Sequence, residues 1–142
     1  MTSRAVLVID TSVAVKWYIP EPGSAHAAAL RQAGKELVSP DLLVAEFGNV
    51  LWKKVRRGEL DRIEAHEIAD AFVRACPLRL WPSLPYTPLA LDLALRFERS
   101  VYDALYLAVA VAHDGAYVTA DERLVHALAN SELAHLIRLL DG

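Results

Sequence analysis

Four carboxylates stand where the sequence predicts that strands end or helices begin. Asp10 directly follows a run of five apolar residues, and Asp121 comes one residue after the end of another short apolar run. Asp103 falls in the first turn of one predicted helix, and Glu46 interrupts the apolar residues of another. Ligands of an open parallel α/β sheet bind at the carboxyl edge of its strands. If the strands before Asp10 and Asp121 are neighbours, these two side chains face each other at that edge.

Such a cluster of acids has a physical cost that limits what it can be. Two unit charges 4 Å apart repel by ~4 kcal/mol at an effective dielectric constant near 20, and a small domain has a stability of only about 5–15 kcal/mol. The cluster must therefore raise a pKa, keep its members apart, or bind a cation. A ligand set of oxygens alone selects a hard ion such as Mg²⁺ or Mn²⁺. One or two ions of this kind, with a bound water as nucleophile, suit the hydrolysis of a phosphodiester.

Each carboxylate also has a purely structural explanation. Asp10 or Ser12 could cap the first helix, and Asp121 could cap the last one. Asp103 could favour the dipole of its helix, and Glu46 could belong to a solvated face. The residues taken singly leave both explanations open, and their shared position at one sheet edge favours a site.

Alternating strands and helices position these acids. Short strands are expected at residues 5–9, 36–38, 78–81, 117–119 and 136–139. Helices are expected at residues 12–18, 25–32, 40–57, 62–76, 88–99, 101–113 and 122–130. The pattern predicts parallel pairing with helices on both faces, which is a three-layer α/β/α sandwich around a parallel sheet of four or five strands.

Local signals set several of the predicted helix starts. Ser39 and Pro40 have the pattern of an N-cap followed by proline at the first helical position. Asp61 and Glu64 have the spacing of a capping box, and Gly58 marks the end of the helix before it.

Composition indicates one compact domain. The chain has 142 residues, of which 54% are hydrophobic, and we expect a single domain over residues 1–142. It has no apolar stretch long enough to span a membrane and no secretory signal, and Cys76 is its single cysteine. These features favour a cytoplasmic protein. The formal net charge of −3 is not typical of a nucleic-acid binder, although a net value can hide a local basic patch.

Four segments in order resemble one known family. They are VIDTSVAVKWYIPE, SPDLLVAEFGNVLWKKVRRGEL, RSVYDALYLAVA and YVTADERL. Together they resemble the acidic motifs of the PIN-domain ribonucleases, most closely the VapC-type toxins of bacterial and archaeal toxin–antitoxin pairs. The resemblance covers nearly the whole chain.

The resemblance implies a metal-dependent endoribonuclease that acts as a toxin, is inhibited by a cognate VapB-type antitoxin and forms a homodimer. It implies that Mg²⁺ or Mn²⁺ is held by four side chains: Asp10, Glu46, Asp103 and Asp121. It gives supporting polar roles to four others: Thr11, Ser12, Thr119 and Asn49.

A dense basic cluster begins two turns after Glu46 and is a candidate contact for the RNA backbone. It consists of Lys53, Lys54, Arg56 and Arg57. Lys16 is a further candidate for a phosphate contact. The alternative for the cluster is a solvated helix end, where cations favour the helix dipole.

Two other functions fit parts of the pattern. A Mg²⁺-dependent phosphatase with Asp10 as nucleophile would need a second acid two residues later, where this chain has Ser12. A non-catalytic, receiver-like α/β regulatory module would carry a lysine on a late strand, and no such lysine is found here.

Overall fold

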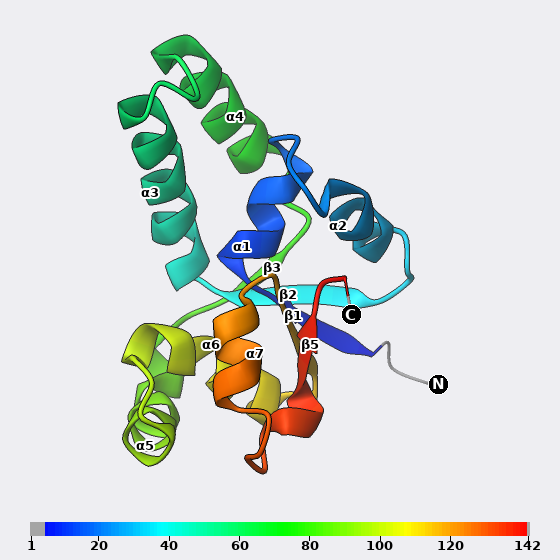
Figure 1. Ribbon diagram of the computed structural model, residues 1–142, viewed down its shortest axis with the longest axis vertical. Helices are drawn as coiled ribbons and strands as arrows, with labels where there is room; N and C mark the ends of the chain where they lie inside the picture. Colours follow the sequence, from blue (N-terminus) through cyan, green and yellow to red (C-terminus); the bar gives the residue numbers. More distant parts are fainter. Residues whose placement is uncertain (1–4, 142) are drawn as a thin grey trace.

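A five-stranded, all-parallel sheet forms the centre of the computed structural model, which describes residues 5–141 (Figure 1). The strand order is β3-β2-β1-β4-β5, and every neighbouring pair is parallel. The strands are β1 (Val6–Ile9), β2 (Glu36–Pro40), β3 (Arg79–Trp81), β4 (Ala116–Thr119) and β5 (Ile137–Leu139). All five predicted strands are therefore confirmed, as is the adjacency of the strands that precede Asp10 and Asp121.

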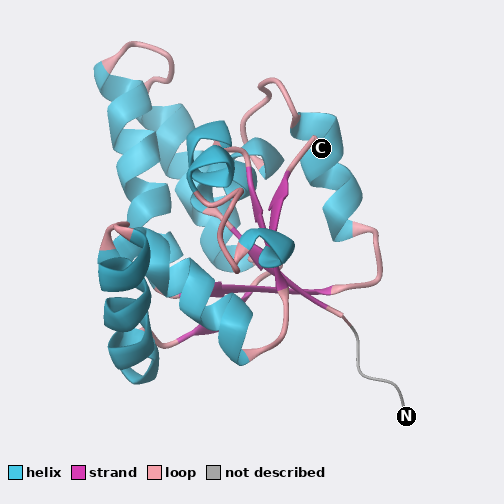
Figure 2. Cartoon of the chain, turned by 60° about the horizontal axis from the view of Figure 1, so that its bottom comes forward, coloured by secondary structure: helices cyan, strands magenta, loops and turns pink. Residues whose placement is uncertain are grey.

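Helices connect the strands and cover both faces of the sheet (Figure 2). The α-helices are α1 (Thr11–Ala14), α2 (Ser24–Arg31), α3 (Leu42–Arg56), α4 (Arg62–Arg74), α5 (Thr87–Phe97), α6 (Val101–Ala112) and α7 (Glu122–Ala127). Three short 3₁₀ turns complete the set: η1 (Val15–Trp17), η2 (Leu84–Tyr86) and η3 (Ala134–Leu136). In Figure 1, α1 to α4 lie above β1 and β2, and α5 and α6 lie below them. The predicted three-layer α/β/α sandwich is thus confirmed.

The core is centred on β1 and α6. Leu7, Val8 and Ile9 of β1 are all buried, because this strand has a neighbour on each side and helices on both faces. Helix α6 packs against β1, β2 and β4, and its residues 104–110 are all buried. Asp10 directly follows β1 and Asp103 lies in the first turn of α6, so two buried elements of the core position two of the four acids.

The start of α3 differs from the prediction. Ser39 and Pro40 complete β2 instead of opening the helix, which begins at Leu42 after Asp41. The reason is tertiary, since the buried Ser39 hydroxyl donates to the carbonyl of Ile9 at 3.0 Å, which fixes Ser39 in the sheet.

The other local signals agree with the structure. Gly58 has a φ of 73°, as expected of a helix stop. The capping box is present, because the Glu64 amide donates to the Asp61 carboxylate at 2.8 Å and the Asp61 amide to the Glu64 carboxylate at 3.1 Å. Within residues 5–141, no helix combines the length and apolar character that crossing a membrane requires.

Candidate active site

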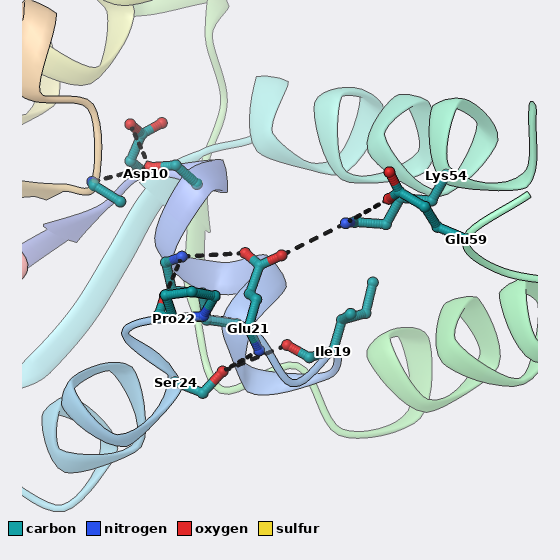
Figure 3. Close-up of polar contacts among 10 residues, drawn as sticks. Asp10, Ile19, Glu21, Pro22, Ser24, Lys54 and Glu59 are labelled. Carbon is teal, nitrogen blue, oxygen red and sulfur yellow. Dashed lines mark hydrogen bonds and ion pairs between the residues drawn. The ribbon is translucent and has the colours of Figure 1, made fainter. Parts of the chain in front are cut away.

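Asp10 lies where β1 ends, next to the end of β4. Its backbone amide donates to the carbonyl of Val118 at 3.1 Å, which fixes the two strand ends side by side. Its carboxylate oxygen Oδ2 accepts hydrogen bonds from Thr119 Oγ1 at 2.6 Å and Ser12 Oγ at 3.0 Å. The Asp10 side chain makes no capping bond to α1, so the capping explanation for this carboxylate is wrong. Figure 3 shows Asp10 with one of these contacts as a dashed line.

The environment of Asp10 disfavours its negative charge. The side chain is mostly enclosed by protein while part of its residue surface reaches solvent. Burial raises the pKa of the Asp10 carboxyl, and the nearby charge of Glu46 raises it further. The hydrogen bonds from Thr119 and Ser12 act in the opposite direction but do not cancel the rise.

Glu46 extends from α3 toward the same place and is held by two hydroxyl groups. Its Oε1 accepts a hydrogen bond from Thr11 Oγ1 at 3.1 Å and another from the Tyr106 hydroxyl. The Thr11 and Tyr106 hydroxyls also contact each other at 2.8 Å, and both residues are buried. Burial and the bond to Glu46 raise the pKa of Tyr106, so its hydroxyl stays a donor.

Tyr106 has a role that the sequence did not reveal. It lies three residues after Asp103, on the same face of α6. The available signal was a tyrosine hydroxyl among the apolar residues of a predicted helix. Its partner Glu46 lies on α3, 60 residues away in the sequence.

Asp103 lies in the first turn of α6, as predicted. The Asp103 amide donates to Ser100 Oγ at 3.1 Å, and its carboxylate accepts a hydrogen bond from Arg99 at 3.0 Å. The charges of Asp103 and Asp10 both raise the pKa of the buried Tyr117, after the larger effect of burial. Asp103 therefore lies near the same buried ring as Asp10, with its charge partly compensated by Arg99.

Asp121 is the N-cap of α7, so the capping explanation is correct for this residue. Its Oδ1 accepts hydrogen bonds from the amides of Arg123 at 3.0 Å and Leu124 at 3.4 Å. Its own amide donates to Thr119 Oγ1 at 3.0 Å. Because that same hydroxyl donates to Asp10, Thr119 links the two acids at the sheet edge.

Thr119 joins Asp10 and Asp121 at one edge of the sheet, but the four carboxylates do not form a closed ligand shell. Within residues 5–141, no three side chains of the His, Cys, Asp and Glu types lie close enough together to hold one metal ion. Of the other three acids, Glu46 is the one whose charge raises the pKa of Asp10.

A divalent cation fits the chemistry of this pair. Hydroxyl groups alone donate to the Asp10 and Glu46 side chains, and no ion pair among the described residues involves either one. Two carboxylates whose charges are not compensated by a cation are oxygen donors suited to Mg²⁺ or Mn²⁺.

The remaining polar candidates have varied surroundings. Thr11, Ser12 and Thr119 all make the hydrogen bonds given above to the acidic pair. Asn49 and Lys53 are exposed on α3, on the stripe that also carries Glu46.

The basic candidates are not all free to meet a ligand. Arg57 is exposed, and the Arg56 guanidinium lies over the Trp52 ring, 5.1 Å from its centroid. Lys16 and Lys54 both contact Glu21, a residue that the sequence analysis did not single out (Figure 3).

Comparisons with known proteins agree with this architecture. The family model described as PIN domain matches residues 7–129. Ribonuclease VapC3 of Pyrobaculum aerophilum is 34% identical over 121 residues, which is 83% of this chain and 91% of that protein.

Two solved structures share the fold. VapBC2 from Rickettsia felis, bound to a DNA fragment from its promoter, has a TM-score of 0.60 at 13% identity and covers 94% of this chain and 98% of its own. Mycobacterium tuberculosis VapC20, described as a sarcin-ricin loop cleaving toxin, has a TM-score of 0.63 at 18% identity and covers 85% of this chain and 94% of its own. The central sheet, the acids at its carboxyl edge and the match over residues 7–129 lead to one conclusion: the chain belongs to the PIN-domain family, alongside its VapC ribonuclease relatives.

Proposed function

We propose that this protein is a metal-dependent endoribonuclease and the toxin of a toxin–antitoxin pair. The observation that carries the proposal is the pair of Asp10 and Glu46 in a PIN-domain fold. Both acids accept hydrogen bonds from hydroxyl groups, neither has a cationic partner among the described residues, and Glu46 is bonded to Thr11, the residue that follows Asp10. The relative VapC3 is named a ribonuclease, and the structural neighbour VapC20 is described as a sarcin-ricin loop cleaving toxin.

Asp10 and Glu46 would hold the divalent ion, either Mg²⁺ or Mn²⁺. Asp103 and Asp121 are the candidates for completing its ligands, although no three of these acids lie close enough together in the described residues to hold one ion as they stand. When bound, the ion supplies Lewis-acid stabilisation of the phosphate and lowers the pKa of an attacking water. Among the protein's own groups, Thr119 and Ser12 both hold the Asp10 carboxylate through its oxygen Oδ2.

The hydroxyls of Thr11 and Tyr106 likewise hold Glu46, and both donate to its oxygen Oε1. Because both hydroxyls are buried and bonded to each other, Glu46 does not depend on solvent for its orientation. Such partners of metal-binding carboxylates typically tune affinity and activity by about 10- to 100-fold.

The RNA backbone would lie along the exposed polar side chains of α3 and the turn that follows it. These candidates are Asn49, Lys53, Arg56 and Arg57 on α3 and at its end, with Lys16 and Lys54 beside them. Contacts of cations with phosphates supply affinity without sequence information.

The proposed partners are a VapB-type antitoxin, for which the VapBC2 complex is the supporting neighbour, and a second copy of this chain in a homodimer. We further propose that residues 1–142 form a single PIN-like domain and that the protein acts in the cytoplasm. The phosphatase alternative gains no support, since Ser12 at the position of the required second acid only donates a hydrogen bond to Asp10.

Cleavage of RNA by purified variants tests the proposal. We expect Asp10→Asn and Asp103→Asn to lose Mg²⁺-dependent cleavage while their circular dichroism spectra match the wild type. Glu36→Gln is the matched control, because it changes the net charge equally and its partner Arg79 lies on an edge strand. Wild-type cleavage by Asp10→Asn, or full activity of the wild type in EDTA, would refute the assignment.

A further inference from the structure

A cavity of about 310 Å³ lies beside the candidate active site and is rich in positive charge. Four cations line it: Lys16, Lys53, Lys54 and Arg57. Ser12 and Ala120 also line it, and the Ser12 hydroxyl donates to Asp10 and accepts from the Ala120 amide at 3.1 Å. This basic cavity therefore shares a wall with the surroundings of Asp10.

One carboxylate, Glu21, also lines the basic cavity and bridges two of its lysines. Its Oε1 lies 3.1 Å from the Lys16 ammonium, and its Oε2 lies 3.5 Å from the Lys54 ammonium (Figure 3). The two lysine side chains are 12% and 18% exposed, and the Glu21 side chain is 25% exposed. The bridge joins the loop after η1 to α3 and holds both ammonium groups in place.

Both lysines have a second acceptor outside this bridge. Lys16 donates to the carbonyl of Pro22 at 2.7 Å, and Lys54 pairs with Glu59 at 3.2 Å. Loss of the Glu21 charge would therefore leave each ammonium tethered near its present position.

The position of Glu21 is one that a phosphate could take. A phosphodiester, like a carboxylate, has two anionic oxygens that can each accept from a separate lysine. The lining of the basic cavity carries four positive charges and one negative charge, in a chain whose formal net charge is −3. This local excess complements a polyanion, and Glu21 is the group that opposes it.

We propose that the basic cavity binds a phosphate of the RNA backbone next to the bond that is cut, and that Glu21 limits this binding by occupying Lys16 and Lys54. The proposal rests on RNA being the substrate of the adjacent site. It assigns Glu21 the role of an internal competitor for the phosphate, which weakens binding of any RNA that does not also engage the acidic site.

Binding of a fluorescent single-stranded RNA oligonucleotide, measured by anisotropy in EDTA over a range of salt concentrations, tests this role. We expect Glu21→Gln to bind the RNA about threefold to tenfold more tightly than the wild type at low salt. Each lysine freed from the carboxylate can neutralise a phosphate, which releases counterions from the RNA. The slope of log K against log salt should steepen by about 0.7 for each lysine freed. Glu36→Gln makes the same change in net charge at the first residue of β2, outside the lining of the basic cavity. It should leave the RNA affinity and the salt slope unchanged.

Two further variants keep the test independent of the fold around Glu21. Lys53→Gln and Arg57→Gln replace exposed side chains that line the same cavity, so the fold should tolerate both. Each should weaken binding and reduce the slope by about 0.7.

Several results would overturn the inference. Unchanged or weaker binding by Glu21→Gln would show that Glu21 only braces the loop, and unchanged slopes for Lys53→Gln and Arg57→Gln would remove the RNA from this cavity. Absence of RNA binding by the wild type and every variant would also show that the RNA does not bind in this cavity. Because the measurement needs no cleavage, a chain that cleaves RNA with Mg²⁺ but fails here keeps the nuclease proposal and loses this one.

Discussion

Replacing Asp10 by asparagine should make the protein more stable while removing its activity. Thr119 and Ser12 both donate to the same oxygen, Oδ2, so an asparagine whose carbonyl takes that position keeps both hydrogen bonds. What is lost is a negative charge that burial and Glu46 disfavour. Removing this charge should raise the free energy of unfolding by about 1–2 kcal/mol, the usual size of a stabilising substitution. For a domain of this size, that gain would raise the melting temperature by roughly 3–6 °C.

The gain should depend on pH in a direction set by the pKa of Asp10. The folded state raises the pKa of Asp10 above its ordinary value and therefore prefers the protonated carboxyl. The contribution of Asp10 to stability is thus most favourable below the pKa of the unfolded chain, and it is lost as pH rises through the folded pKa. Asp10→Asn should match the stability of the wild type below about pH 4 and exceed it at about pH 7.

Thermal unfolding in EDTA, followed by circular dichroism at several pH values, measures this difference. Added Mg²⁺ should raise the melting temperature of the wild type, because at a tenfold excess over Kd it adds about 1.4 kcal/mol to the free energy of unfolding. The same addition should have little effect on Asp10→Asn. A variant less stable than the wild type near neutral pH, or a gain that does not change with pH, would refute the reasoning about the charge of Asp10.

Three other substitutions test the packing that supports the site. Tyr106→Phe should weaken Mn²⁺ binding by roughly tenfold, because Glu46 loses a hydroxyl donor, and should lower the free energy of unfolding by about 1 kcal/mol; unchanged metal affinity by calorimetry would contradict the positioning role. Gly115→Ala should destabilise the fold by about 1–3 kcal/mol in urea unfolding, since a Cβ there would meet the carbonyl oxygen of Val6 at 2.9 Å. Gly48→Ala is its counterpart within α3, where nothing lies within 4 Å of the added carbon, and should stabilise by about 0.8 kcal/mol; equal effects of the two glycine variants would show that steric contact does not decide the outcome.

Local sequence patterns predicted the layers of the fold well because each depends on residues close in the chain. The apolar run before Asp10 marks a strand buried on both faces, and Asp61 with Glu64 marks a helix start, whatever the rest of the molecule does. Ser39 and Pro40 show where this logic fails. Their pattern is that of a helix start, but a hydrogen bond to Ile9 of a neighbouring strand keeps Ser39 in the sheet.

The sequence and the family resemblance named the candidate acids and the hydroxyls of Thr11, Ser12 and Thr119, but they did not name Tyr106 or Glu21. Asp10 stood out because of its place after a strand. The contribution of Tyr106 arises from contact with α3, and that of Glu21 from lysines on two separate elements. Such contacts between distant segments leave no periodic or spacing signal in a single sequence.

Titration of Mn²⁺ into the purified protein by calorimetry, with Glu46→Gln for comparison, measures most directly whether the acids of separate elements act as one site. The wild type should bind the ion, and Glu46→Gln should bind it at least about tenfold more weakly while keeping its fold. Equal affinity of the two proteins, or no binding by the wild type, would contradict the account.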